Sequence, residues 1–264
     1  MTSTTKPPEL APVQVSSQPA PRPMRASRME PEYWIPRDTT SLVDVGCNAG
    51  ALLEDCRHWF PNVKLAGVDI NADAIQIAKR KLPDAEIQQA FGFELPFADN
   101  RFDCATCIEV IEHVPQEYRA QLVAEIRRVL RPGGRMILRC PHDGIFSCLD
   151  AQNFRFRWPR LYQRLVGEGS RDVHYREVKE ELVWHHHFRR EELLEIAGPG
   201  WKLEECHFGG LLLFPISDVL RWPFYRKNRG DHWMVRALEK MATWELAYSF
   251  GRSSYGILIV MTKV

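Results

Sequence analysis

The sequence predicts an α/β fold: a Rossmann-like sheet of seven mostly parallel strands with helices on both faces. Three observations support this prediction. Strand-like and helix-like segments alternate from residue 41 onward, and one strand runs directly into a glycine-containing turn and a helix over residues 43–50. The chain has 264 residues and is 45% apolar, which is enough for one sizeable core. Such alternation is typical of a parallel sheet with right-handed crossovers.

The individual elements follow from hydrophobic periodicity and turn residues. Strands are expected over residues 41–45, 64–70, 86–89, 102–108, 135–140, 201–208 and 255–264, the last one antiparallel. Helices are expected over residues 49–60, 72–82, 116–130 and 190–197, with two more as helical cap insertions within 209–250. Ligands of such sheets bind at the carboxyl ends of the strands, so the loops that follow the strands are the expected site.

Composition excludes several classes of protein. The formal net charge is +1, so no overall basic field points to nucleic acid. The cysteines number seven, an odd count, and most lie in apolar stretches, which favours buried thiols in a reducing compartment. The sequence contains no apolar run of about 18 residues and no secretory signal, so we expect a cytoplasmic protein.

The strongest local signal is the turn that follows the first expected strand, with the sequence VDVGCNAG at residues 43–50. Gly46 and Gly50 let the backbone approach a ligand closely, and Asn48 can take the left-handed conformation between them. The helix that begins there offers free N–H groups to an anion. Asp69 ends the second strand, where a carboxylate can accept hydrogen bonds from both ribose hydroxyls. Its alternative role is to cap the helix that starts near Ala72.

Residues 41–140 resemble class I S-adenosylmethionine-dependent methyltransferases, in the large family related to ubiquinone-biosynthesis enzymes (the type 11 domain). Four blocks match in order: VDVGCNAG, AGVDI, ELPFADNRFD, and EVIEHV followed by LRPGGRMIL. The resemblance implies S-adenosyl-L-methionine as the cofactor. Asp44 and Gly46 then hold the methionine amino group, Asp69 binds the ribose, and Ile70 packs on the adenine. A dehydrogenase is the competing interpretation, but the spacing of the two glycines favours adenosylmethionine over NAD.

The adenine contact departs from the family pattern. Relatives often carry Gly-Asp-Ala before Leu-Pro-Phe, and the aspartate accepts a hydrogen bond from the adenine amine. Here the stretch is Ala90-Phe91-Gly92, and Phe91 can only stack on the base. We therefore expect Phe91, Gly92 and Ile108 to complete the cofactor site.

Catalysis is expected in the loops after the fourth and fifth strands. The pattern Glu109-Val-Ile-Glu112-His113 follows the fourth strand, and its two glutamates share one face if the segment is helical. The resemblance implies two alternatives. In some oxygen-methylating relatives these residues and a later histidine, here within His185–His187, bind a divalent metal; in others no metal is used. We assign no metal ligand, and we expect His113, Glu109 and His142 to act as the base or to orient the acceptor.

The chain divides into four expected segments. Residues 1–28 form a disordered tail because they are rich in Pro, Ser and Thr. Residues 29–140 form the cofactor-binding core, residues 141–200 an acceptor-binding cap rich in aromatic residues and arginine, and residues 201–264 the last strands with a helical insertion. Aromatics beside basic residues over 209–227 suit a core helix or a peripheral membrane contact.

These segments predict an S-adenosylmethionine-dependent methyltransferase that O-methylates a small molecule, a glycan or a lipid-linked glycan. The second half loosely resembles bacterial methyltransferases associated with cell-surface polysaccharide. The alternatives are an N- or C-methyltransferase of a natural-product scaffold and a catalytically silent cofactor-binding partner. The sequence leaves the oligomeric state open.

Overall fold

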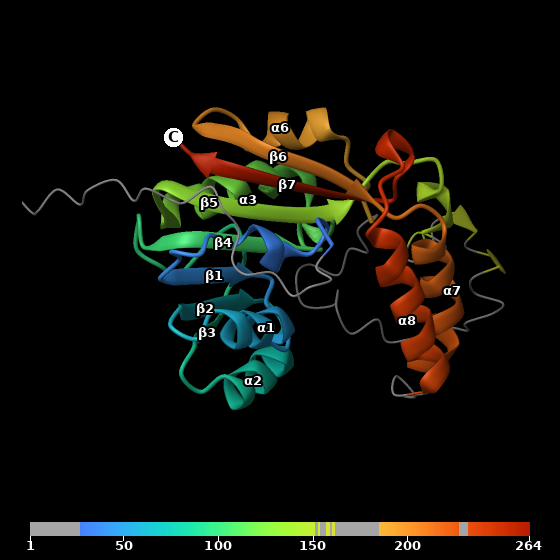
Figure 1. Cartoon of the computed structure of the whole chain (residues 1–264), viewed down its shortest axis with the longest axis horizontal. Coiled ribbons are helices and arrows are strands. Elements are labelled where there is room, and N and C mark those ends of the chain that lie inside the picture. The colour runs from blue at the N-terminus through green and yellow to red at the C-terminus, as the bar shows by residue number, and fades with distance from the viewer. Residues whose placement is uncertain (1–26, 151–152, 154–156, 159, 162–184, 227–231) are drawn as a thin grey trace, which may run out of the picture.

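The computed structural model describes residues 27–264 except 151–152, 154–156, 159, 162–184 and 227–231. It contains a seven-stranded sheet in the order β3-β2-β1-β4-β5-β7-β6, with β7 antiparallel to both neighbours (Figure 1). The strands are β1 (Ser41–Val45), β2 (Lys64–Asp69), β3 (Glu86–Gln89), β4 (Phe102–Ile108), β5 (Leu130–Pro141), β6 (Trp201–Gly209) and β7 (Gly256–Lys263). The predicted fold class is confirmed, whereas the expected disordered tail lies almost wholly outside the described residues.

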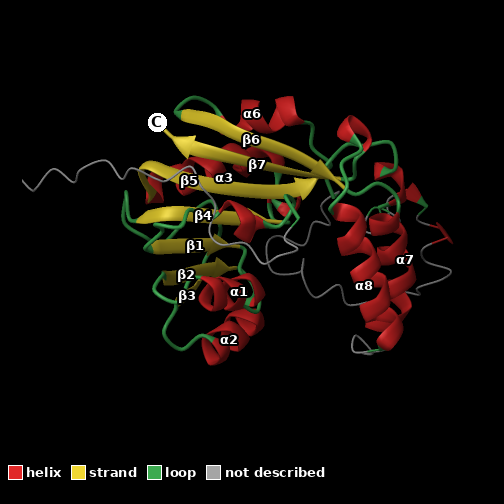
Figure 2. Ribbon diagram, in the orientation of Figure 1, coloured by secondary structure: helices red, strands yellow, loops and turns green. Residues whose placement is uncertain are grey.

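Helices cover both faces of the sheet (Figure 2). The α-helices are α1 (Ala51–Trp59), α2 (Ala72–Lys81), α3 (Gln116–Val129), α6 (Arg190–Ala197), α7 (Leu213–Arg226) and α8 (Trp233–Leu246). Side chains alternate between two cores, as the pleat of a strand requires. In β1, Leu42 packs with α1 and α2, while Val43 and Val45 pack with α3 and α6. The two cores hold the sheet and the loops at its carboxyl edge in place.

Two features differ from the sequence prediction. We expected the fifth strand to begin at residue 135, but β5 already begins at Leu130, which pairs with Phe102. A register irregularity between Phe102 and Cys104 lets the extra residues continue the strand. In addition, the short helix η1 (Pro31–Trp34) packs on the sheet, and the Trp34 carbonyl accepts a hydrogen bond from Arg135 at 2.9 Å.

The insertion between β6 and β7 folds as the predicted pair of helices. The α7–α8 hairpin lies beyond the carboxyl ends of β4 and β5, at the same edge as the loops expected to form the site (Figure 1). Among the described residues, none of the helices combines the length and the apolar character that crossing a bilayer requires.

Candidate functional site

The loop after β1 has the backbone conformation that its sequence predicts. Gly46 and Asn48 both have positive φ, at 82° and 46°. The Gly46 N–H donates to the carbonyl of Val68 at 2.8 Å, which ties the loop to the end of β2. The Asn48 side chain accepts from the Ala49 N–H at 2.7 Å. Gly50, also left-handed, is the N-cap of α1, so the first N–H groups of this helix face the loop.

Asp69 connects this loop to the next one. One carboxylate oxygen accepts from the Asn48 N–H at 2.8 Å and the other from the Asn71 N–H at 2.9 Å. The cap of α2 is Asn71, whose side chain accepts from the N–H groups of Asp73 and Ala74. Asp69 is therefore free of the capping role, and each of its oxygens keeps a lone pair for a ribose hydroxyl.

Asp44 lies at the bottom of the same loop, almost fully buried. Its carboxylate accepts a hydrogen bond from the Thr106 hydroxyl at 2.7 Å. Burial raises the pKa of Asp44 to about 7, although the Thr106 hydrogen bond opposes the shift. An ammonium group placed beside this carboxylate would stabilise its charged form. This is the electrostatic environment expected of a group that binds a methionine amine.

The adenine side of the site consists of apolar residues. The Phe91 ring is exposed and stacks on Phe93 at 5.0 Å between centroids, and Phe93 stacks on Tyr118 at 4.5 Å. Gly92 has a packing role: a Cβ there would lie 2.7 Å from Leu122. The other predicted contacts, Ile70 and Ile108, are half-buried at the ends of β2 and β4. Phe91 is the exposed outer ring of this stack of three, and its contact with the adenine base stays a prediction.

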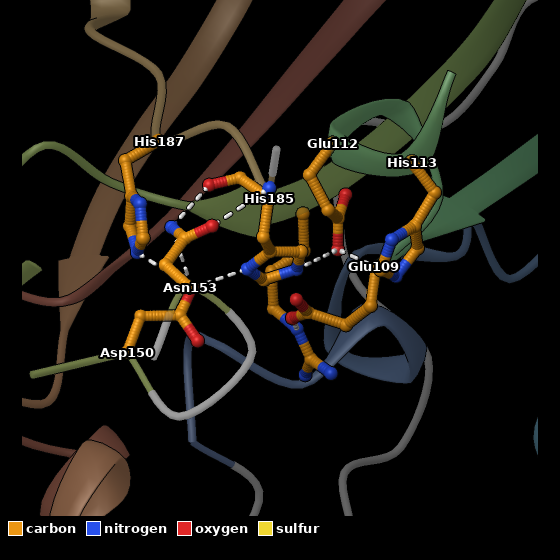
Figure 3. A network of polar contacts seen from close by, with 8 residues as sticks. Glu109, Glu112, His113, Asp150, Asn153, His185 and His187 are labelled. Carbon is orange, nitrogen blue, oxygen red and sulfur yellow. Dashed lines mark hydrogen bonds and ion pairs between the residues drawn. The ribbon is translucent and has the colours of Figure 1, made fainter. Parts of the chain in front are cut away.

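A buried polar cluster lies beside this loop (Figure 3). It is adjacent because β1 pairs with β4, so the loops that follow them are neighbours. The Glu112 side chain is 0% exposed, and its Oε1 atom lies 3.9 Å from His113 Nε2 and 3.8 Å from His185 Nε2. Neither Glu112 oxygen has a hydrogen-bond partner among the described residues. Unpartnered buried carboxylate oxygens indicate a ligand-binding position.

Residues far along the chain hold His185 in this cluster. Its Nδ1 pairs with the Asp150 carboxylate. The Asn153 side chain makes two hydrogen bonds to the backbone of His185: it accepts from the His185 N–H at 2.9 Å and donates to the His185 carbonyl at 2.7 Å. Burial alone would lower the pKa of His185, but the hydrogen bond with Asp150 and the negative charges of Asp150 and Glu112 raise it to about 10. Burial lowers the pKa of neighbouring His187 to about 4. The pair is therefore one charged and one neutral imidazole at neutral pH.

Comparison with known proteins agrees with this geometry. A family model described as a methyltransferase domain matches residues 43–138, from β1 through most of β5. The chain contains a class I, S-adenosylmethionine-dependent methyltransferase domain. The cluster residues Asp150, Asn153 and His185 lie beyond the matched residues of this methyltransferase domain.

Relatives match the methyltransferase domain more than the rest of the chain. The ubiquinone biosynthesis O-methyltransferase of Alkalilimnicola ehrlichii is 32% identical over 120 residues, 42% of this chain and 47% of the relative. The ubiquinone/menaquinone biosynthesis C-methyltransferase of Hahella chejuensis is 34% identical over 109 residues, 39% of this chain and 43% of the relative. The chain thus spans less than half the length of either. A solved SAM-dependent methyltransferase from Methanosarcina mazei shares the fold, with a TM-score of 0.52, 20% identity, and coverage of 87% of this chain and 94% of that one.

Two predicted catalytic residues take unexpected positions. Glu109 is not helical: it has a φ of +55°, its carboxylate pairs with Arg139 at 2.9 Å, and only residues 111–113 form a short helix, η2. The left-handed residue breaks the turn, so Glu109 and Glu112 do not share a helix face. His142 is buried, with Nδ1 2.9 Å from the Ser254 carbonyl and its ring 4.9 Å from that of Phe208. With these contacts, His142 packs against its neighbours at the end of β5.

Two groups of acidic and histidine side chains have the spacing that a metal ion would require. Ligand atoms of Glu112, His113 and His185 all lie within 4.8 Å of one another, and so do those of Asp150, His185 and His187.

The sequence did not predict Asp150 or Asn153 as site residues, because no motif marks them. Of the aromatic and basic residues expected in the cap, Phe154, Arg155, Phe156, Tyr162, Arg164 and Trp184 lie outside the described residues, and Trp158 is exposed.

Proposed function

We propose that this protein transfers the methyl group of S-adenosylmethionine to a hydroxyl group of a small molecule, a glycan or a lipid-linked glycan. The observation that carries the proposal is the position of the Glu112–His113–His185 cluster. These acid and histidine side chains stand next to the cofactor loop, at the carboxyl edge where a substrate would meet the methyl group. A hydroxyl acceptor is the class of acceptor that needs such groups, because its proton must be removed.

We assign His113 as the residue that takes the proton of the acceptor hydroxyl. The sulfonium is an excellent leaving group, so the protein chiefly positions the acceptor and excludes water. The His113 side chain is 31% exposed, whereas that of His185 is 8% and that of Glu112 is 0%. His113 is therefore the member of the cluster that a substrate reaches most easily. It would accept the hydroxyl proton as the oxygen–carbon bond forms, while the breaking carbon–sulfur bond leaves its electron pair on sulfur.

The remaining groups of the cluster would stabilise the protonated form of His113 and position the side chains around it. The buried Glu112 carboxylate would stabilise the imidazolium that His113 becomes. His185 already carries a proton at neutral pH, so it is a poor base and acts as a fixed cation between Glu112 and Asp150. Asn153 fixes the backbone of His185 through two hydrogen bonds. We assign Asp150 and Asn153 as positioning residues.

The cluster also fits the divalent metal that some relatives of this family use. Both Glu112 oxygens are buried without a hydrogen-bond partner among the described residues, and carboxylate and imidazole are suitable ligands for such an ion. Glu112, His113 and His185 would hold it. A bound ion would lower the pKa of an acceptor hydroxyl. In that case His113 would serve as a ligand, and the predictions below separate the two roles.

The test is transfer of labelled methyl from S-adenosylmethionine into acceptors that present a phenol, a sugar hydroxyl, an amine or an activated carbon. We expect label only in alkali-stable ethers on oxygen, and loss of this label in His113→Ala with cofactor binding intact. Label on nitrogen or carbon would instead support an N- or C-methyltransferase. Calorimetric binding of the cofactor without transfer to any acceptor class, in the purified protein or with cell extract, would support the silent partner and contradict the proposal.

A further inference from the structure

Helix α8 presents large aromatic side chains to solvent. The exposed fractions are 68% for Trp233, 60% for Trp244 and 50% for Tyr248. Trp233 and Trp244 are about three helical turns apart, so they lie on the same side of α8, and Tyr248 follows just after the helix ends at Leu246. Trp244 and Tyr248 contact each other, with ring centroids 4.9 Å apart. We call Trp233, Trp244 and Tyr248 the aromatic stripe.

The opposite side of α8 is the side that packs on the protein. Its buried residues are Val235, Ala242 and Glu245. Glu245 accepts hydrogen bonds from backbone N–H groups at the start of α7, at distances from 2.7 Å to 3.2 Å. The hairpin is therefore anchored by its inner side, and the aromatic stripe is not needed for that packing. Core packing therefore does not account for these exposed side chains.

On helix α8, the exposed charges next to the aromatic stripe are both positive. Arg236 and Lys240 are exposed and lie within one turn of the stripe on the helix. The two carboxylates of α8 are engaged elsewhere: Glu239 pairs with Arg221 of α7 at 3.0 Å, and Glu245 is buried. Exposed tryptophan and tyrosine beside basic residues match the headgroup region of an anionic bilayer, where aromatic rings sit at the boundary and cations meet lipid phosphates.

We propose that α8 lies on the surface of an anionic phospholipid bilayer through its aromatic stripe, with Arg236 and Lys240 contacting lipid phosphates. A second copy of this chain is a poorer partner, because a symmetric pairing through this face would bring like charges of the two copies together. The surface also has a suitable place in the fold. The hairpin lies at the carboxyl edge of the sheet (Figure 1), and α7 contacts the segment η3 (Ser147–Leu149), which leads directly to Asp150.

The placement has a consequence for the acceptor. A bilayer beneath α8 would bring membrane-embedded substrates to the edge of the sheet where the cluster stands. Binding to the bilayer does not depend on catalysis, so it is testable even if the proposed reaction is wrong. If both proposals hold, a lipid-linked hydroxyl acceptor follows from them.

The experiment is co-sedimentation of the full chain with vesicles of phosphatidylcholine alone and of phosphatidylcholine with about one-third phosphatidylglycerol. We expect binding to the anionic vesicles that weakens as salt rises. The double variants Trp233→Ala/Trp244→Ala and Arg236→Glu/Lys240→Glu should each lose roughly tenfold or more in partition coefficient. Matched controls are Trp59→Ala, an exposed tryptophan on α1, and Lys79→Glu/Arg80→Glu on α2, which should bind as the wild type does.

Circular dichroism and calorimetry with S-adenosylmethionine establish that each variant is folded. Equal vesicle binding by the wild type and both α8 variants would overturn the proposal. So would a wild-type dimer that dissociates in Trp233→Ala/Trp244→Ala without any vesicle binding, because the aromatic stripe would then be an interface between copies. Binding of the wild type to neutral and anionic vesicles alike would refute the role of the two cations.

Discussion

Val110 occupies the space in which a side chain at Gly46 would lie: its Cγ2 atom is 2.2 Å from the position of a Cβ on Gly46. Gly46 belongs to the cofactor loop after β1, and Val110 stands between Glu109 and Glu112 in the loop after β4. The absence of a side chain at one position therefore brings the cofactor loop into contact with the loop that carries the acids and His113.

The first prediction concerns this contact. Gly46→Ala adds a clash with Val110 to the strain of a positive φ, and overpacking of this kind costs about 1–3 kcal/mol beyond the strain itself. We expect a lower melting temperature and a loss of cofactor affinity in calorimetry. The control is Gly251→Ala, which has a similar φ of 58° and nothing within 4 Å. It should lose only about 1–2 kcal/mol and keep its cofactor affinity. Equal effects of the two variants would show that the contact with Val110 is unimportant.

The second prediction concerns pH. Burial raises the pKa of Asp44 to about 7, so the folded protein keeps a proton that the unfolded chain releases above about pH 4. The contribution of Asp44 to the free energy of unfolding of the cofactor-free protein therefore falls as pH rises from about 4 to about 7. Asp44→Asn removes this loss. The melting temperature of the variant, relative to wild type, should increase over that range and then stay constant.

Asp103→Asn is the control of opposite sign. Hydrogen bonds from Thr40 and the charge of Arg131 outweigh burial and hold the pKa of Asp103 below its ordinary value. Its stabilising contribution is present above the pKa of the unfolded chain and is lost as pH falls through the folded value. The variant should therefore be less stable than wild type at neutral pH, with a deficit that shrinks in acid. If Asp44→Asn shows no dependence on pH, the assigned burial effect is wrong.

The third prediction separates the two histidines that the sequence marks as catalytic. His113→Ala should lower kcat by roughly 10²–10⁴, the usual contribution of a general base, without changing cofactor affinity. His142→Ala should instead lower the free energy of unfolding by about 1–3 kcal/mol, because it leaves the buried carbonyl of Ser254 without a partner. Initial rates and chemical denaturation measure the two effects. A large kcat effect in a stably folded His142→Ala would return that residue to the chemistry.

The fourth prediction concerns divalent ions at Glu112. An ion that binds the folded protein stabilises it, by about 2.7 kcal/mol when its concentration is a hundred times the Kd. After treatment with a chelator, titration with Mn²⁺ or Zn²⁺ should raise the melting temperature of wild type but not of Glu112→Gln. Glu54→Gln, a surface glutamate paired with Lys81, should respond as wild type does. A melting temperature that does not respond to any divalent ion in the wild type would exclude the metal role.

Local patterns predicted most elements and the cofactor loop. Strands 86–89 and 102–108 and helix 190–197 have the bounds that periodicity gives, because these segments are defined by alternation and turn residues within a few positions. The left-handed Asn48 was also predictable, since the turn between two glycines is short and its conformation is local. Glu109 was not: its left-handed backbone occurs together with an ion pair to Arg139 on β5, a residue 30 positions away in the sequence.

Local sequence patterns were enough to predict the alternating α/β framework and the glycine-containing turn after β1, because hydrophobic periodicity and glycine geometry act over a few residues. Only the tertiary structure brought Asp150, Asn153 and His185 to Glu112, and only it turned Trp233 and Trp244 outward. Those arrangements depend on strand order and on how an insertion packs. Such contacts form between segments distant in the chain, and no spacing along the sequence encodes them.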